Sequence, residues 1–95
     1  MQRSQKNLLA GYISKAAKDP RLNTTQLSLY MALLYVWQNQ QCIASFRISR
    51  KELMQLSKIA STSTYHICIK KMIDVGYLKY EPTYNCYKGS RITLL

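Results

Sequence analysis

Acidic residues are scarce in this chain of 95 residues. It has four of them and 14 lysines and arginines, which gives a formal net charge of +10 at pH 7. The acids Asp19, Glu52, Asp74 and Glu81 are scattered and form no paired-carboxylate pattern for acid–base catalysis. The one histidine, His66, belongs to no cluster with metal-ligand spacing. The three glycines are too dispersed for a phosphate-binding loop. We therefore expect neither an enzyme nor a bound metal or cofactor.

Cysteines and long apolar runs are also scarce. Cys42, Cys68 and Cys86 are odd in number and lack paired spacing, so we expect reduced thiols in the cytoplasm rather than a disulfide framework. The longest apolar run, 29–37, is much shorter than the ~20 residues that cross a bilayer. The first residues hold no apolar core of a secretory signal. The basic charge indicates a polyanion partner, above all nucleic acid, and no membrane.

Apolar spacing predicts a single domain over residues 1–95. Residues 1–24 form a basic N-terminal segment with a short helix at 8–17 that ends before Pro20. Asn23 and Gln26 have the spacing of a helix cap and its reciprocal partner. Positions 27–37 are apolar except Ser28, which predicts a helix buried on all sides and able to extend into a dimer contact.

Residues 43–60 predict a strand, a short helix and a turn. The strand spans 43–48, where apolar and polar residues alternate. Ser49 and Glu52 then form a capping box, S-x-x-E, at the start of a helix. Leu53 and Leu56 are expected to face inward, and residues 57–60 make the turn.

The next helix begins at Ser61 and has two distinct faces. Its end is marked by Gly76, which suits a left-handed backbone. Helical spacing separates an apolar, core-seeking face, made of Tyr65, Cys68, Ile69 and Met72, from an outer face made of Ser63, His66, Ile67 and Lys70.

The last part of the chain predicts a β-hairpin. In residues 77–81 Leu78 and Tyr80 should face inward and Tyr77 outward, and in residues 91–95 Ile92 and Leu94 should face inward. The polar residues 82–90 form the loop. The tyrosines on apolar faces, expected in the core, are Tyr30, Tyr35, Tyr65 and Tyr80. Tyr84 and Tyr87 in the loop remain candidates for nucleic-acid contact.

In this order of elements the chain resembles the winged helix-turn-helix family. The resemblance lies in ISRKELMQLSKIASTSTYHICIKKMIDVGYL and in the wing YEPTYNCYKGSRITL, and it covers roughly residues 25–95. More narrowly, the chain is similar to small winged-helix proteins of bacterial mobile elements, which act as regulators, replication initiators or recombination directionality factors (excisionases). The resemblance implies a mainly α fold with a small β-hairpin (α+β), a helix-turn-helix at about 49–76 and a wing at about 77–95.

The resemblance also implies a DNA-binding surface. The recognition helix would begin at Ser61 and enter the major groove. The residues that would face DNA from this helix are Thr62, Ser63, His66, Ile67 and Lys70, and those from the wing are Lys88, Ser90 and Arg91. Arg47, Arg50 and Lys51 cluster at a helix N-terminus, which itself favours phosphate. The outer face of the recognition helix lacks the Arg, Asn and Gln that make bidentate base contacts, so we expect modest sequence reading.

These observations predict a double-stranded DNA-binding protein that acts in transcription regulation or DNA architecture on a mobile element. An excisionase and a replication-initiation accessory protein remain alternatives, and so does a protein–protein adaptor. The expected partners are duplex DNA, further copies of the chain bound as a homodimer or cooperatively, and a recombinase or another DNA-processing protein.

Overall fold

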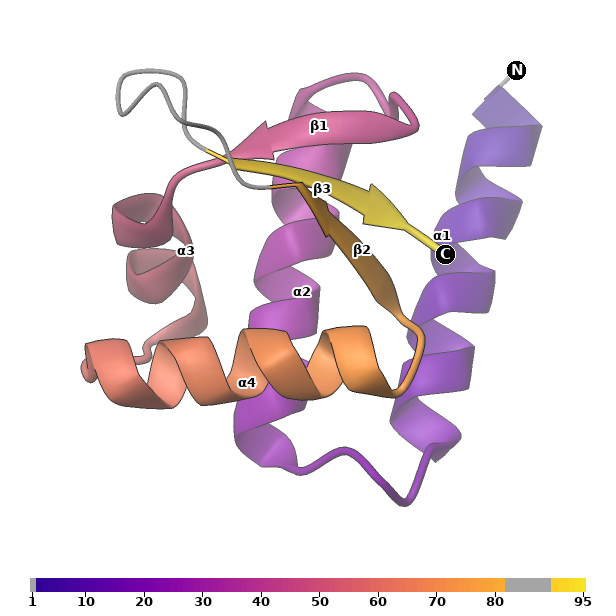
Figure 1. Cartoon of the computed structure of the whole chain (residues 1–95). Helices are drawn as coiled ribbons and strands as arrows, with labels where there is room; N and C mark the ends of the chain where they lie inside the picture. The colour runs from indigo at the N-terminus through magenta and orange to yellow at the C-terminus, as the bar shows by residue number, and fades with distance from the viewer. Residues whose placement is uncertain (1, 82–89) are drawn as a thin grey trace.

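The computed structural model describes the backbone of residues 2–81 and 90–95, and side chains from Leu8 onward. Within these residues the chain forms four helices and one three-stranded antiparallel sheet (Figure 1). The elements, in chain order, are α1 (Gln2–Lys18), α2 (Thr24–Asn39), β1 (Ser45–Ile48), α3 (Arg50–Ser57), α4 (Thr62–Asp74), β2 (Leu78–Glu81) and β3 (Ser90–Leu94). The fold is therefore a small α+β fold, as the sequence predicts.

Helix α1 is longer than the sequence indicates. It begins at Gln2 rather than at residue 8, because Gly11 does not interrupt it and the polar residues before it continue the helix. Contact with the core is narrow: Ala16 is buried, and the Tyr12 ring meets the Trp37 ring edge-on at 5.5 Å between centroids. Leu8 and Ala17, expected on the apolar face, are exposed. In Figure 1 α1 lies beside α2 at the edge of the molecule.

The predicted cap of α2 is confirmed. The Asn23 side chain accepts from the Gln26 N–H at 2.9 Å, and the Gln26 side chain accepts from the Asn23 N–H at 3.0 Å. The helix passes behind α4 and the sheet (Figure 1) and supplies the centre of the core. The prediction of burial on all sides is wrong, because Met31 and Tyr35, one turn apart, are 49% and 52% exposed.

The three strands are ordered β1-β3-β2, so β3 is central and β1 is an edge. One face of the sheet joins the core: Phe46 pairs with Ile92, and Leu78 pairs with Leu94. Strand β1 begins at Ser45, two residues later than predicted, and Ile43 is 47% exposed.

Two tyrosines after α4 differ from the prediction, Tyr77 in its orientation and Tyr80 in its degree of burial. Tyr77 was expected to face outward from a strand, but it precedes β2 and is buried, since Gly76 (φ +84°) turns the chain back and the Tyr77 N–H donates to Met72 O at 2.9 Å. Its hydroxyl donates to the Asp19 carboxylate at 2.6 Å. Tyr80 shares the inward row with Ile92 but is 38% exposed, because it lies on the edge strand β2.

Helix α3 keeps one half of its predicted capping box. The Ser49 hydroxyl accepts from the Glu52 N–H at 3.3 Å, and no described hydrogen bond returns from the Glu52 carboxylate. Leu53 is fully buried as expected. Leu56 is 39% exposed, because in so short a helix the inward face is taken by Leu53 and Ser57, and Leu56 lies on its flank.

Candidate nucleic-acid interface

The outer face of α4 is the main surface to which the sequence assigns nucleic-acid contact. Thr62 and the four residues predicted to face outward are all exposed, namely Ser63, His66, Ile67 and Lys70. Ile67 is 66% exposed, the largest value among the exposed large apolar side chains that the structure describes. An isoleucine in this position contributes little to folding and is free to contact a partner.

The opposite face of α4 fixes the helix against the core. Tyr65, Cys68, Ile69 and Met72 are buried there, as predicted. The helix starts at Ser61, whose hydroxyl accepts from the Thr64 N–H at 3.3 Å. Leu34 and Leu53 belong to the same core, whereas Leu56, expected to face inward, is exposed.

Tyr65 lies where α3, α4 and the sheet converge. Burial raises the pKa of its hydroxyl to about 12, nearby Tyr80 adds to the shift, and the cation of Arg50 opposes it. The Tyr65 ring also meets the His66 ring edge-on at 5.4 Å between centroids. Arg50 of α3 and Tyr80 of β2 therefore lie within electrostatic range of Tyr65, which itself contacts His66.

The turn between α3 and α4 has a defined geometry. Lys58 adopts a left-handed backbone (φ 65°), which is unfavourable for a side chain of this kind. The next residue, Ile59, is buried, and its N–H donates to Met54 O at 3.0 Å. Ser28 of α2 donates to Ser57 O at 2.6 Å and ties the turn to the central helix. These bonds fix the end of α3 against α2, and the buried face of α4 packs on the same central helix.

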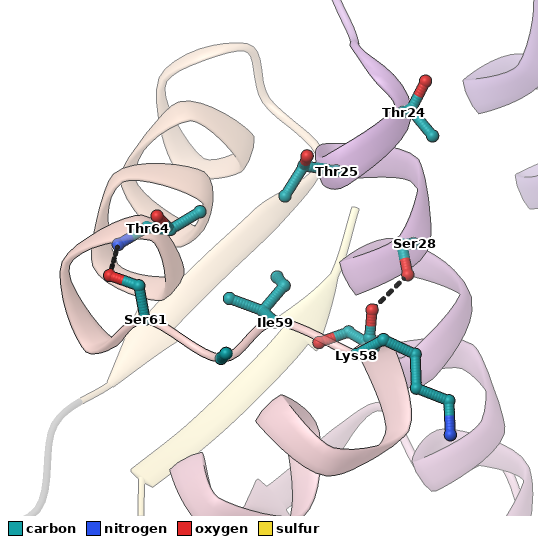
Figure 2. Close-up of a pocket in the computed structure, with 9 residues that line it drawn as sticks. Thr24, Thr25, Ser28, Lys58, Ile59, Ser61 and Thr64 are labelled. Carbon is teal, nitrogen blue, oxygen red and sulfur yellow. Dashed lines mark hydrogen bonds between the residues drawn. The ribbon is translucent and has the colours of Figure 1, made fainter.

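A pocket lies beside this turn (Figure 2). Its lining comes from the start of α2, the turn and the first turn of α4: Thr24, Thr25, Ser28, Ser57, Lys58, Ile59, Ala60, Ser61 and Thr64. Six of the nine lining residues are serines or threonines, and the hydroxyls of Ser28 and Ser61 already make hydrogen bonds. The pocket flanks the outer face of α4 and is not part of it, because the outward residues of that helix do not line it.

The predicted basic cluster at the start of α3 is divided by the structure. Arg50 and Lys51 occupy the first turn of α3 and are exposed. Arg47 instead lies on β1, exposed and directly opposite Arg91 of β3. Arg47 therefore shares a face of the sheet with Arg91, since successive strand residues alternate between faces.

The segment predicted to be the wing is described only in β2 and β3. Ser90 opens β3, is half-buried, and its hydroxyl shares a hydrogen bond of 2.9 Å with the Tyr80 hydroxyl. Arg91 is exposed. Lys88, Tyr84 and Tyr87, also predicted to contact nucleic acid, lie outside the described residues.

Three residues with a bearing on this surface were missed by the sequence analysis. Asp74 follows Lys70 by one helical turn and is exposed, so a carboxylate lies at the end of the outer face of α4. Helical spacing alone is sufficient to find it. Lys79 is exposed on β2, and alternation along the strand is sufficient to find it. Lys58 gave no local signal, because glycine and asparagine are the usual left-handed residues.

The described residues contain no group of three or more His, Cys, Asp and Glu side chains placed to hold a metal ion. None of the described helices has the length and apolar character needed to cross a membrane. Comparison of the chain with family models, curated proteins and solved structures gave no match.

Proposed function

We propose that the chain is a winged helix-turn-helix protein that binds double-stranded DNA, with α4 as its recognition helix. In this proposal α3 and α4 (Arg50–Ser57 and Thr62–Asp74) are the two helices of the motif, and β2 and β3 flank the wing. The outer face of α4 enters the major groove, and exposed lysines and arginines contact phosphates.

The outer face of α4 is the observation that carries the proposal. Ser63, His66, Ile67 and Lys70 are exposed together, while the other side of the same helix is anchored in the core. A hydroxyl, an imidazole and a methyl-bearing side chain can contact base edges singly, and the lysine suits a phosphate. The formal net charge of +10 adds a general electrostatic attraction between the protein and the phosphates of any duplex.

Binding to fluorescently labelled duplexes, measured by anisotropy across a series of salt concentrations, tests the proposal. Each phosphate that is neutralised contributes about −0.9 to the slope of log affinity against log salt. Lys70→Ala should make the slope shallower by about one such unit. Lys18→Ala, which removes the same charge from an exposed position on α1, serves as the matched control. Absence of binding to any duplex at low salt rules the proposal out.

Within this function we favour transcription regulation or DNA architecture on a mobile element, with excision or replication accessory roles as variants of the same DNA-binding activity. A protein–protein adaptor is the second candidate. It is favoured by the exposed Met31 and Tyr35 of α2, which are adjacent on one helical face. Tyr35→Ala separates the two: it leaves duplex affinity unchanged if α4 binds DNA, and it abolishes partner binding if this face is the adaptor surface.

A further inference from the structure

The face of the sheet that points away from the core carries a concentration of positive charge. The register places Glu81, Arg91 and Arg47 in one row across the three strands, and Lys79, Thr93 and Ser45 in the next row. The four charged residues of these rows are all exposed. These two rows therefore contain one acid, Glu81, and three cations, Lys79, Arg47 and Arg91.

Arg47 and Arg91 are brought especially close by the hydrogen-bonding pattern. The Gln40 side chain pairs with the backbone of Arg47: Nε2 donates to Arg47 O at 2.6 Å, and the Arg47 N–H donates to Oε1 at 3.2 Å. Both backbone groups of Arg47 thus point away from β3. In an antiparallel pair this makes Arg47 and Arg91 a non-hydrogen-bonded pair, in which the Cα atoms are ~4.5 Å apart and the side chains are nearest.

The same alternation keeps the acid further away. Because the backbone groups of Arg91 point toward β2, Arg91 and Glu81 are a hydrogen-bonded pair, with Cα atoms ~5.5 Å apart. The one salt bridge among the described residues joins Arg21 to Asp19, so Glu81 does not close on Arg91. Residues 82–89 contain no acidic residue. Like charges directly opposite each other destabilise a sheet. Arg47 and Arg91 lie directly opposite each other, and among the described residues neither forms a salt bridge with an acid.

We propose that Arg47 and Arg91 form a phosphate clamp that holds the backbone of a nucleic acid on the outer face of the sheet. Two guanidinium forks on neighbouring strands match the oxygens of one phosphodiester group, and each makes charge-assisted hydrogen bonds to it. The phosphate removes the repulsion between the two cations. Gln40 holds the backbone of Arg47 in register at the free edge of β1. This clamp rests on the proposed DNA-binding function and adds a second contact surface to the outer face of α4.

Charge reversal at one member of the pair tests the clamp. Arg47→Glu puts a carboxylate opposite Arg91, so the melting temperature without DNA should stay level or rise. Affinity for a duplex should fall ~10-fold or more, since a charge-assisted phosphate contact is replaced by repulsion. Lys18→Glu makes the same change in net charge at an exposed position of α1, and its smaller loss of affinity measures the effect of charge alone.

The outcomes separate this inference from the function on which it rests. Wild-type protein that binds no duplex refutes both. Wild-type binding that weakens in Lys70→Ala, but is equal in Arg47→Glu and Lys18→Glu, refutes the clamp alone. A lower melting temperature of Arg47→Glu also refutes it, because the pair would then have a structural role. Loss of affinity in Arg47→Glu and in Arg91→Glu, without loss of stability, supports it.

Discussion

Ile67 and Ile69 lie two residues apart on α4 and allow the same substitution to be made on its two faces. Ile69 is 6% exposed and Ile67 is 66% exposed. Replacing Ile69 by alanine removes three buried carbons, worth about 2.4 kcal/mol at ~0.8 kcal/mol each, before the cavity is counted. With the cavity, the expected loss lies within ~2–5 kcal/mol, a large part of the ~5–15 kcal/mol that stabilises a typical domain.

Ile67→Ala should leave stability within about 0.5 kcal/mol of wild type, because the side chain is already in solvent. Its duplex affinity should fall instead, through loss of an apolar contact in the major groove. Urea unfolding followed by circular dichroism measures the first quantity and fluorescence anisotropy the second. If Ile69→Ala melts like wild type, or if Ile67→Ala is the destabilised variant, then the assignment of the two faces of α4 is inverted.

Three further substitutions test individual contacts. Hydrogen bonds from Arg21 and Tyr77 hold the pKa of Asp19 well below its usual range. Its ionised form therefore stabilises the fold above about pH 4, and this contribution is lost as the pH falls. In an acid titration of unfolding, Asp19→Asn should lose less stability than wild type as the pH is lowered. Lys58→Gly should raise the free energy of unfolding in urea by ~1 kcal/mol, since glycine accepts the left-handed backbone without strain. Asp74→Asn should tighten duplex binding measured by anisotropy, and unchanged affinity would show that the end of α4 is remote from DNA.

Local patterns in the sequence were sufficient for the elements that position the site. The capping pair of Asn23 and Gln26, the cap at Ser61 and the left-handed Gly76 are confirmed, because each depends on residues within one or two turns. The two faces of α4 also follow from helical spacing alone. The order of helices and strands was therefore predictable, while the assignment of this order to a DNA-binding family remains a proposal.

Features that depend on contacts distant in the sequence were not predictable in this way. Tyr35 continues an apolar run but points to solvent, because the elements that pack on α2 cover only part of its circumference. The Tyr77 hydroxyl donates to Asp19, 58 residues earlier in the chain, a contact that no local pattern indicates. Arg47 lies opposite Arg91 only because β3 pairs with β1, and this register cannot be read from either strand alone.

The proposed recognition helix and the proposed arginine clamp together lead to a prediction about DNA shape. The outer face of α4 offers no long bidentate side chain, so base contacts alone provide limited specificity. In the proposed complex, contacts to phosphates on two surfaces make binding sensitive to how easily a site deforms, at a bending cost of ~1–6 kcal/mol for 20–30 base pairs. A circular-permutation gel assay on the natural site should show a bend for wild-type protein that decreases in Arg47→Glu, with several copies bound side by side. A single unbent palindrome, occupied by a dimer and overlapping a promoter, would instead identify a simple repressor and count against an architectural role.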